Sequence, residues 1–181
     1  MSRLDGYKEA LFDRFDITLW LNSYEDIFSD FDPRPYSKKA LSSDFLEEMK
    51  RASVDKVAPI PLVLLVPKSD RNRKSEKVIK KRLKEHFQKH NLQLSKQRVG
   101  IMKEGASFAV AGFIIMLVAS FILFKYEESF LKAVLITVFD PAGWFLFWRG
   151  LELILFESKN KTPDFTFYNK MEKSNVYFRS Y

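Results

Sequence analysis

Two long runs of apolar residues dominate the pattern of hydrophobic and polar positions along the chain. Residues 105–124 carry no charged side chain, and a second apolar run follows over residues 130–152 after a short polar link. Twenty residues of α-helix are about 30 Å long, which is the thickness of the hydrocarbon core of a bilayer. The pattern therefore predicts a transmembrane helical hairpin with spans at about 105–124 and 130–152.

Two shorter segments have the patterns of β-strands. In residues 15–22, apolar side chains occupy every second position from Phe15 to Leu21, which is typical of a strand that is buried on one face. Residues 59–67 form a short apolar run bounded by prolines, which predicts a strand that is buried on both faces.

Helical periodicity marks two further segments. Apolar side chains recur at three- to four-residue spacing in residues 37–52 and 75–91, so both are predicted to be helices. The first helix could instead begin at residues 42–44, where two serines and an aspartate suit a helix start. We expect a short break after residue 91, before residues 92–103 lead into the first span.

After the hairpin, two features again indicate extended structure. Phe165 and Phe167 alternate briefly with polar residues, and residues 176–181 have the composition of a terminal strand. The alternation of strands and helices before the hairpin favours a parallel pair joined by a crossover. The predicted fold is a small cytoplasmic α/β domain, with a three- to four-stranded and at least partly parallel sheet, interrupted by the hairpin. Its parts are residues 1–98, 99–158 and 159–181.

Charge is distributed unevenly, which gives the hairpin a direction. Residues 1–67 hold nine basic and twelve acidic side chains, whereas residues 68–98 hold twelve basic and three acidic ones, a net charge of +9 directly before the first span. The connecting segment 125–132 balances two lysines with two glutamates. Basic residues concentrate on the cytoplasmic side of membrane helices. We therefore expect a two-span protein of the cell membrane with both termini in the cytoplasm.

Composition excludes several kinds of site. The chain has no cysteine, which rules out disulfides, thiolate metal sites and cysteine nucleophiles. Its two histidines, His86 and His90, are one helical turn apart, but no third metal ligand lies near them in the sequence. No catalytic motif with diagnostic spacing is present. We expect no cofactor and no enzymatic activity.

The first span carries small residues on one helical face, a pattern that lets a neighbouring backbone approach closely in lipid. These residues are Gly105, Ala109, Gly112 and Ala119. The neighbour is either the second helix of the same hairpin or a helix of another subunit, and the sequence leaves both open.

The second span contains charged residues, which are costly at membrane depth and usually face protein or water. If the helix runs straight, Asp140 lies near mid-membrane and Pro141 kinks the helix; alternatively, Asp140 caps a new helix that begins at Pro141. Asp140 could line the pathway of an ion or proton, but a cap, a kink or a hydrogen bond between helices would explain it as well. Arg149 and Glu152 are one turn apart and can pair near the inner surface.

Charged residues of opposite sign follow the two strands that are predicted to pair, where ligands bind in open α/β sheets. Asp26, Asp30 and Asp32 are candidate ligands for a magnesium ion, but no complete motif supports a metal site. The basic residues after the second strand could bind a phosphate group or anionic lipid headgroups. They are Lys68, Arg71, Arg73, Lys74, Lys77, Lys80, Lys81, Arg82 and Lys84. Nucleic acid is a poor candidate partner, because this segment lacks aromatic side chains on which bases could stack.

These features lead to three functional hypotheses. The leading one is a non-enzymatic scaffold or regulatory module that self-associates or holds a protein partner at the cytoplasmic face of the membrane, with anionic lipid headgroups as further partners. The first alternative is a subunit of an oligomeric channel or transporter with Asp140 in the pathway. The second alternative is a membrane-tethered sensor of a phosphate-bearing ligand.

Overall fold

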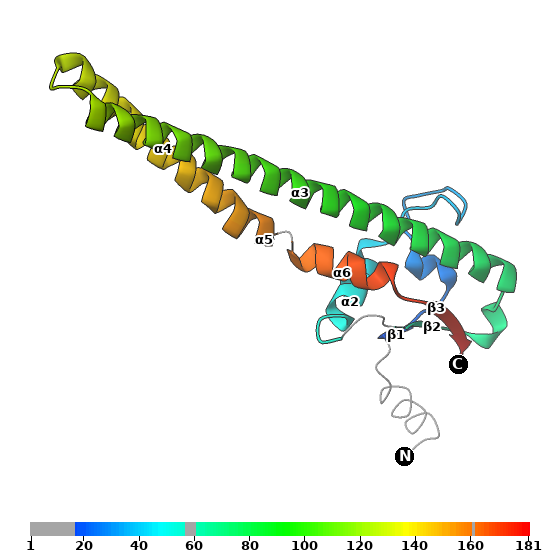
Figure 1. The fold of residues 1–181 in the computed structure, drawn as a ribbon. Coiled ribbons are helices and arrows are strands. Elements are labelled where there is room, and N and C mark those ends of the chain that lie inside the picture. The colour runs from blue at the N-terminus through cyan, green and yellow to red at the C-terminus, as the bar shows by residue number, and fades with distance from the viewer. Residues whose placement is uncertain (1–16, 57–60, 161) are drawn as a thin grey trace. The chain divides into compact units, whose positions relative to one another are not determined.

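The computed structural model describes residues 17–56, 61–160 and 162–181. Its sheet has three parallel strands, β1 (Ile17–Trp20), β2 (Leu62–Val66) and β3 (Val176–Ser180), in the order β1-β2-β3 (Figure 1). The chain thus has a mixed α/β fold in which most described residues are helical. Two ends of the predicted strands, Phe15 and residues 59–60, lie outside the described residues.

The central position of β2 in the sheet follows from its composition. All five of its residues are buried, and Leu64 and Val66 are fully excluded from solvent. A strand that is apolar at every position is stable only where both of its faces are covered. Pro67 follows directly and ends the strand, because proline has no N–H for the hydrogen-bond ladder.

Three helices pack their apolar sides on one face of the sheet: α2 (Ser43–Ala52), the N-terminal part of α3 (Arg73–Lys125) and α6 (Thr162–Glu172). The helices contribute residues three or four positions apart, and the strands contribute alternate residues. The main core residues are Ile17, Leu62, Leu64, Val66, Phe178, Phe45, Met49, Ile79, Leu83, Phe87, Phe167 and Met171.

α2 begins later than the periodicity of residues 37–52 suggests. Its N-cap is Ser42, so the alternative start at residues 42–44 is confirmed and a start at residue 37 is wrong. Phe28 and Leu41 form an isolated antiparallel bridge, which holds the chain extended up to the cap. Contacts with the preceding loop therefore outweigh helical periodicity at this point.

The break expected after residue 91 is absent. α3 is a single helix from Arg73 to Lys125. Residues 92–104 contain no proline and consist mostly of residues that favour helices, so the local sequence does not interrupt the backbone hydrogen bonds.

The brief alternation of Phe165 and Phe167 does not mark a strand, because both residues lie in α6. Phe167 and Met171 are one helical turn apart and are both buried. The helical period of this segment extends past the two phenylalanines and is visible only over the longer range.

The chain forms two compact units. The first contains the described residues up to Leu92 together with Phe165–Tyr181, and the second contains the described residues of Gln93–Asp164. β3 follows the second unit in the sequence but pairs with β2 of the first. The second unit is therefore an insertion within the α/β domain.

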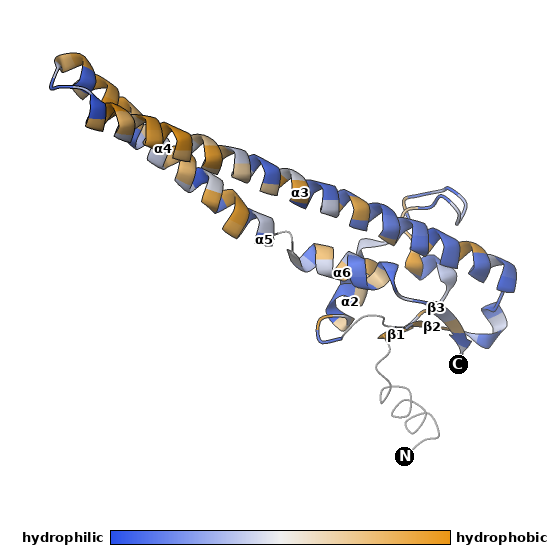
Figure 2. Cartoon of the chain, in the orientation of Figure 1, coloured by the Kyte–Doolittle hydropathy of each residue, from blue (hydrophilic) through white to orange (hydrophobic). Residues whose placement is uncertain are grey.

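The second unit consists of the C-terminal part of α3, α4 (Phe130–Glu152), the π-helical turn η3 (Leu153–Glu157) and α5 (Ser158–Asn160). By length and composition, the helices over Arg73–Lys125 and Phe130–Glu157 could each cross a membrane. Many apolar side chains of this unit are exposed, and in Figure 2 much of α4 and of the adjoining part of α3 has the orange colour of hydrophobic residues.

Glycines bring α3 and α4 into close contact. A methyl group on Gly112 would lie 2.6 Å from the Gly143 carbonyl oxygen, and one on Gly150 would lie 2.6 Å from the Gly105 carbonyl oxygen. A methyl group on Gly105 would in turn lie 2.8 Å from the Gly150 carbonyl oxygen. These distances are shorter than van der Waals contact, so a larger residue would push the two backbones apart.

The two glycine pairs are one heptad apart on each helix, which sets the register of the hairpin. The backbone of Ala109 lies against Gly150, and Ala119, a further heptad along α3, is buried. The structure thus places the second helix of the same chain against the small-residue face of the first span.

Gly112→Ala should destabilise the hairpin by roughly 1–3 kcal/mol, because the added methyl group overpacks the helix contact. Gly100→Ala is the matched control in the same helix, since nothing lies within 4 Å of its added methyl group. It should be neutral or stabilising by up to about 1 kcal/mol. Thermal unfolding of the full chain in detergent, followed by circular dichroism, measures both variants. Equal unfolding temperatures would contradict the close contact at Gly112.

Candidate functional site

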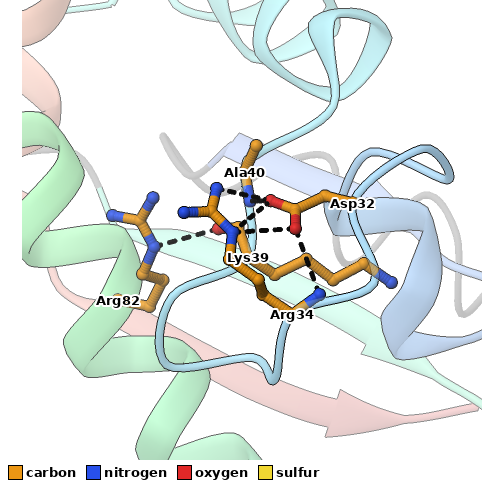
Figure 3. A network of polar contacts seen from close by, with 5 residues as sticks. All are labelled: Asp32, Arg34, Lys39, Ala40 and Arg82. Atoms are coloured by element: carbon orange, nitrogen blue, oxygen red, sulfur yellow. Dashed lines mark hydrogen bonds and ion pairs between the residues drawn. The ribbon is translucent and has the colours of Figure 1, made fainter.

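The acidic residues that follow β1 are engaged by their own loop. Asp32 accepts hydrogen bonds from the Arg34 guanidinium and from the Ala40 N–H, each at 2.7 Å (Figure 3). These donors hold the pKa of Asp32 well below its usual range. Arg82 of α3 donates to the Lys39 carbonyl oxygen at 3.0 Å and so ties the loop to the helix.

Two further carboxylates, in the 3₁₀-helix η1 (Tyr24–Ile27), have similar partners. Glu25 pairs with Lys39 and accepts a hydrogen bond from the Tyr36 hydroxyl at 2.7 Å, and both contacts lower the pKa of Glu25. Burial and the neighbouring Glu25 carboxylate raise the pKa of Tyr36 to about 12. Asp26 accepts a hydrogen bond from the Asn22 N–H at 2.6 Å and belongs to the cap of η1.

The structure does not bring the candidate magnesium ligands together. Asp26 is part of a helix cap, Asp32 is held by Arg34, and Asp30 is exposed. Within the described residues, no group of three or more histidine and acidic side chains is placed to hold a metal ion. Asp26 and Asp32 therefore stabilise the loop through hydrogen bonds within it.

A buried tyrosine joins the loops that follow β1 and β2. The Tyr24 hydroxyl donates to Glu76 Oε1 at 3.0 Å and accepts from the Asn72 N–H at 2.9 Å. Arg71 donates to both carboxylate oxygens of Glu76. Burial alone would raise the pKa of Glu76, but the hydrogen bonds from Arg71 and Tyr24 outweigh it and lower that pKa. The polar groups at the carboxyl end of the sheet thus satisfy one another.

Sequence reasoning missed Tyr24 and Glu76. Glu76 did leave a signal, because it is the only acidic residue between positions 71 and 84 and lies one turn before Ile79, which is in the core. Tyr24 left none, since its partner is 52 residues away in the sequence. Only the parallel pairing of β1 and β2 brings the two loops together.

The basic residues after β2 divide into two groups. Arg71 binds Glu76, Arg82 binds a loop carbonyl, and the Lys80 ammonium lies 5.8 Å from the ring centres of two aromatic residues in β3. Because Arg71 is already engaged by Glu76, it is not available to bind a phosphate-bearing ligand. The others are exposed and form what we call the cationic surface: Lys68, Arg73, Lys74, Lys77, Lys81 and Lys84, of which Lys81 also pairs with Glu85 at 3.8 Å.

The two histidines belong to the packing of α3 against α6. The ring centres of His86 and His90 are 4.1 Å apart, and His90 stacks on Tyr168 at 5.1 Å. Burial lowers the pKa of His86 to about 4, with further lowering by the charges of His90, Arg82 and Lys89. At neutral pH the His86 ring is uncharged and packs as an aromatic side chain.

Asp140 lies within a continuous helix. α4 runs through Pro141 and has Ser129 as its N-cap, so the interpretation of Asp140 as the cap of a new helix is wrong. Its side chain is exposed, and within the described part of the chain no hydrogen bond or ion pair reaches the carboxylate. A charge at membrane depth costs about 2.5–3.5 kcal/mol on insertion scales. Asp140 is thus the one charged group of α4 that the hairpin leaves without a polar contact in the described structure.

Arg149, near the end of α4, binds two carboxylates. It donates to Glu152 at 2.9 Å and to Glu157 at 2.8 Å. The sequence singled out Glu152 by its spacing but not Glu157, which reaches Arg149 from the end of the π-helical turn η3. π-Helical turns within α-helices occur frequently at functional sites.

Comparisons with protein family models, with curated proteins and with solved structures found no match for this chain. Inferences about its function therefore come from its residues and their arrangement.

Tyr24→Phe should destabilise the α/β domain by roughly 1–3 kcal/mol, because it leaves the Asn72 N–H without its acceptor and Glu76 without one donor. Tyr177→Phe is the control, since Tyr177 is 47% exposed on β3. Amide hydrogen exchange of the full chain in detergent should be faster in Tyr24→Phe over β2 and the first turns of α3. Unchanged protection there would show that the network does not hold the two loops together.

Proposed function

We propose that this chain is a two-span protein of the cell membrane, with both termini in the cytoplasm, that acts as a non-enzymatic, self-associating scaffold or regulatory module at the cytoplasmic face. The observation that carries the proposal is the construction of the hairpin. Its inner contact is made by glycines, whereas its outer surface is apolar and exposed.

Lipid is the solvent that suits this outer surface. In each candidate span, only 11% of the most apolar window is buried within the structure. Phe113, Leu117 and Phe121, for example, are each more than half exposed. A core helix of a water-soluble domain buries such side chains, whereas a membrane helix presents them to hydrocarbon.

The loop after β1 supports a role in holding a protein partner. Phe31 is 97% exposed and lies between Asp30 and Asp32 on a loop that Arg34, Lys39 and their neighbours cross-link. Because the loop is already ordered, contact with a partner would cost little conformational entropy. A large aromatic side chain presented in this way is typical of a protein interface.

Orientation follows from charge. The basic residues that precede the first span belong on the cytoplasmic side, and the segment 125–132, which holds two lysines and two glutamates, belongs outside. The α/β domain, which is built from segments on both sides of the hairpin, then lies wholly in the cytoplasm.

Single cysteines test this topology directly, because the chain has none of its own. Glu127→Cys places a thiol in the link between the helices, and Lys173→Cys places one after α6, both at exposed positions. A membrane-impermeant maleimide should label Glu127→Cys in intact cells, and Lys173→Cys only after the cells are permeabilised. The cysteine-free chain is the control. Labelling of Lys173→Cys from outside, or release of the protein from membranes by alkaline carbonate, would refute the proposal.

We also propose anionic lipid headgroups as partners of the exposed lysines of α3. Each lysine near a charged membrane surface contributes about 1 kcal/mol, and salt weakens the attraction. The cationic surface on α3 includes Lys77 and Lys84 and has no aromatic side chains for nucleic acid.

A polarity-sensitive dye on Gln88→Cys, an exposed position of α3, tests this contact in the full chain in nanodiscs. Its emission should shift to the blue when phosphatidylserine replaces part of the phosphatidylcholine. The shift should disappear at high salt and in Lys77→Glu/Lys84→Glu, but not in the control Lys38→Glu/Lys173→Glu, which changes the same charge elsewhere. Emission that does not depend on lipid charge would exclude this partner.

A further inference from the structure

The carboxylate of Asp140 lies on the outer surface of the hairpin. α4 packs on α3 through Gly143 and Gly150, whereas the Asp140 side chain is exposed. Within the described residues no donor from α3 or α4 reaches it. The described structure thus leaves the Asp140 carboxylate open to a donor from a second molecule.

The glycine register gives the depth of Asp140. Gly112 lies opposite Gly143, and the two helices are antiparallel. Three residues further along α3 and three residues back along α4, Ile115 is therefore level with Asp140. Ile115 lies midway through the uncharged residues 105–124. Asp140 is thus at the centre of the apolar surface, where water is farthest away.

Asp140 belongs to a stripe along one side of α4. Residues at three- to four-residue spacing share a helix face, and the residues on this face are exposed. This Asp140 stripe consists of Ala133, Thr137, Asp140, Trp144 and Trp148. It combines a small residue, a hydroxyl donor, a carboxylate acceptor and two aromatic rings.

We propose that the Asp140 stripe is the surface through which two copies of this chain associate in the membrane, with Asp140 of each copy accepting a hydrogen bond from Thr137 of the other. The inference rests on the proposed function, because it requires the hairpin to lie in a bilayer.

A second copy suits the stripe because the stripe is self-complementary. Copies inserted in the same orientation have parallel α4 helices, so equivalent residues lie at equal depth about a two-fold axis. Across this axis, Thr137 of one copy is one helical turn from the level of Asp140 of the other, so the two side chains can meet and each carboxylate gains a hydroxyl. Hydrocarbon tails supply no hydrogen-bond donor at this depth.

The Thr137 hydroxyl also gains a stronger acceptor in the proposed dimer. In the single chain, Thr137 Oγ1 donates to the Ala133 carbonyl oxygen at 2.7 Å, a neutral acceptor. Hydrogen bonds to a carboxylate are shorter and stronger than those to a neutral oxygen. Ala133, one turn further along the same face, leaves room for the two helices to approach.

Disulfide cross-linking in native membranes tests the stripe. Ala133→Cys places a thiol on it, and Val134→Cys places one at the next residue, at the same depth but on another face of the helix; both positions are exposed. A membrane-permeant oxidant should cross-link two copies of Ala133→Cys and leave Val134→Cys monomeric, because a disulfide requires Cα atoms within about 7 Å.

Second-site variants of Ala133→Cys test the hydrogen bonds. Asp140→Leu and Thr137→Val should each lower the yield of cross-linked dimer roughly tenfold, since either change removes both reciprocal bonds. Asp140→Asn keeps an acceptor oxygen and should retain most of the yield. Asp140→Leu makes the span more apolar, so failure to insert would not explain its loss of dimer.

Two kinds of failure are distinguishable. If alkaline carbonate extracts the Ala133→Cys protein, the proposed membrane function fails, and the inference fails with it. If the protein stays in the membrane but does not cross-link, or if Ala133→Cys cross-links equally with and without Asp140, the inference alone is overturned. Asp140 would then face a different protein or a water-filled path.

Discussion

The close approach of two helix backbones is the constraint on which the rest of this structure depends. Lipid tails are as apolar as leucine, so helices in a membrane gain little from burying apolar side chains against each other. Close packing is what holds such helices together, and Gly105, Gly112, Gly143 and Gly150 allow it in this hairpin, which we propose to lie in a membrane, because they have no side chain at the contact. The spacing of one heptad on each helix then fixes which residues are level with each other. The level of Asp140 along the hairpin and the face it occupies both follow from that register.

The α/β domain solves a different problem, because it must satisfy charged loops at the end of a small sheet. Tyr24 reaches from the loop after β1 to Glu76 and Asn72 beyond β2, and Arg71 neutralises the same carboxylate. Glu25, Asp26 and Asp32 likewise find donors within residues 22–40. Groups that could have held a phosphate or a metal ion are used to hold the loops in place. What remains for partners is the outward-facing part of the loop, with Phe31 exposed on it, and the exposed lysines of α3.

The order of elements along the chain links these two parts. β2 pairs with β1 on one side, but its other neighbour, β3, comes after both helices of the hairpin. Parallel strands require a long crossover, and here the inserted unit forms part of it. The sheet is therefore complete only after the hairpin has been synthesised. The core of the domain therefore depends on residues from both sides of the hairpin. Long-range pairing of this kind is entropically expensive and slow.

By itself the sequence determined the features that arise from local pattern: the apolar run of β2, the two long apolar helices and the strand at the end of the chain. The period and the length of an apolar run indicate which side chains are buried, and both can be seen in neighbouring residues alone. The helical state of Phe167 and the continuity of α3 past residue 91 are also local in origin, but they are visible only over a longer range of the sequence. Tertiary structure decided the rest. It chose between the two starts that the sequence allows for α2, since the bridge between Phe28 and Leu41 keeps the chain extended up to the N-cap Ser42. It also gave each charged or small residue its neighbour, turning Glu76 towards Tyr24 and the glycines towards α4 while leaving Asp140 exposed. A side chain's partner depends on distant segments, as the 52 residues between Tyr24 and Glu76 show, and no local pattern contains that information.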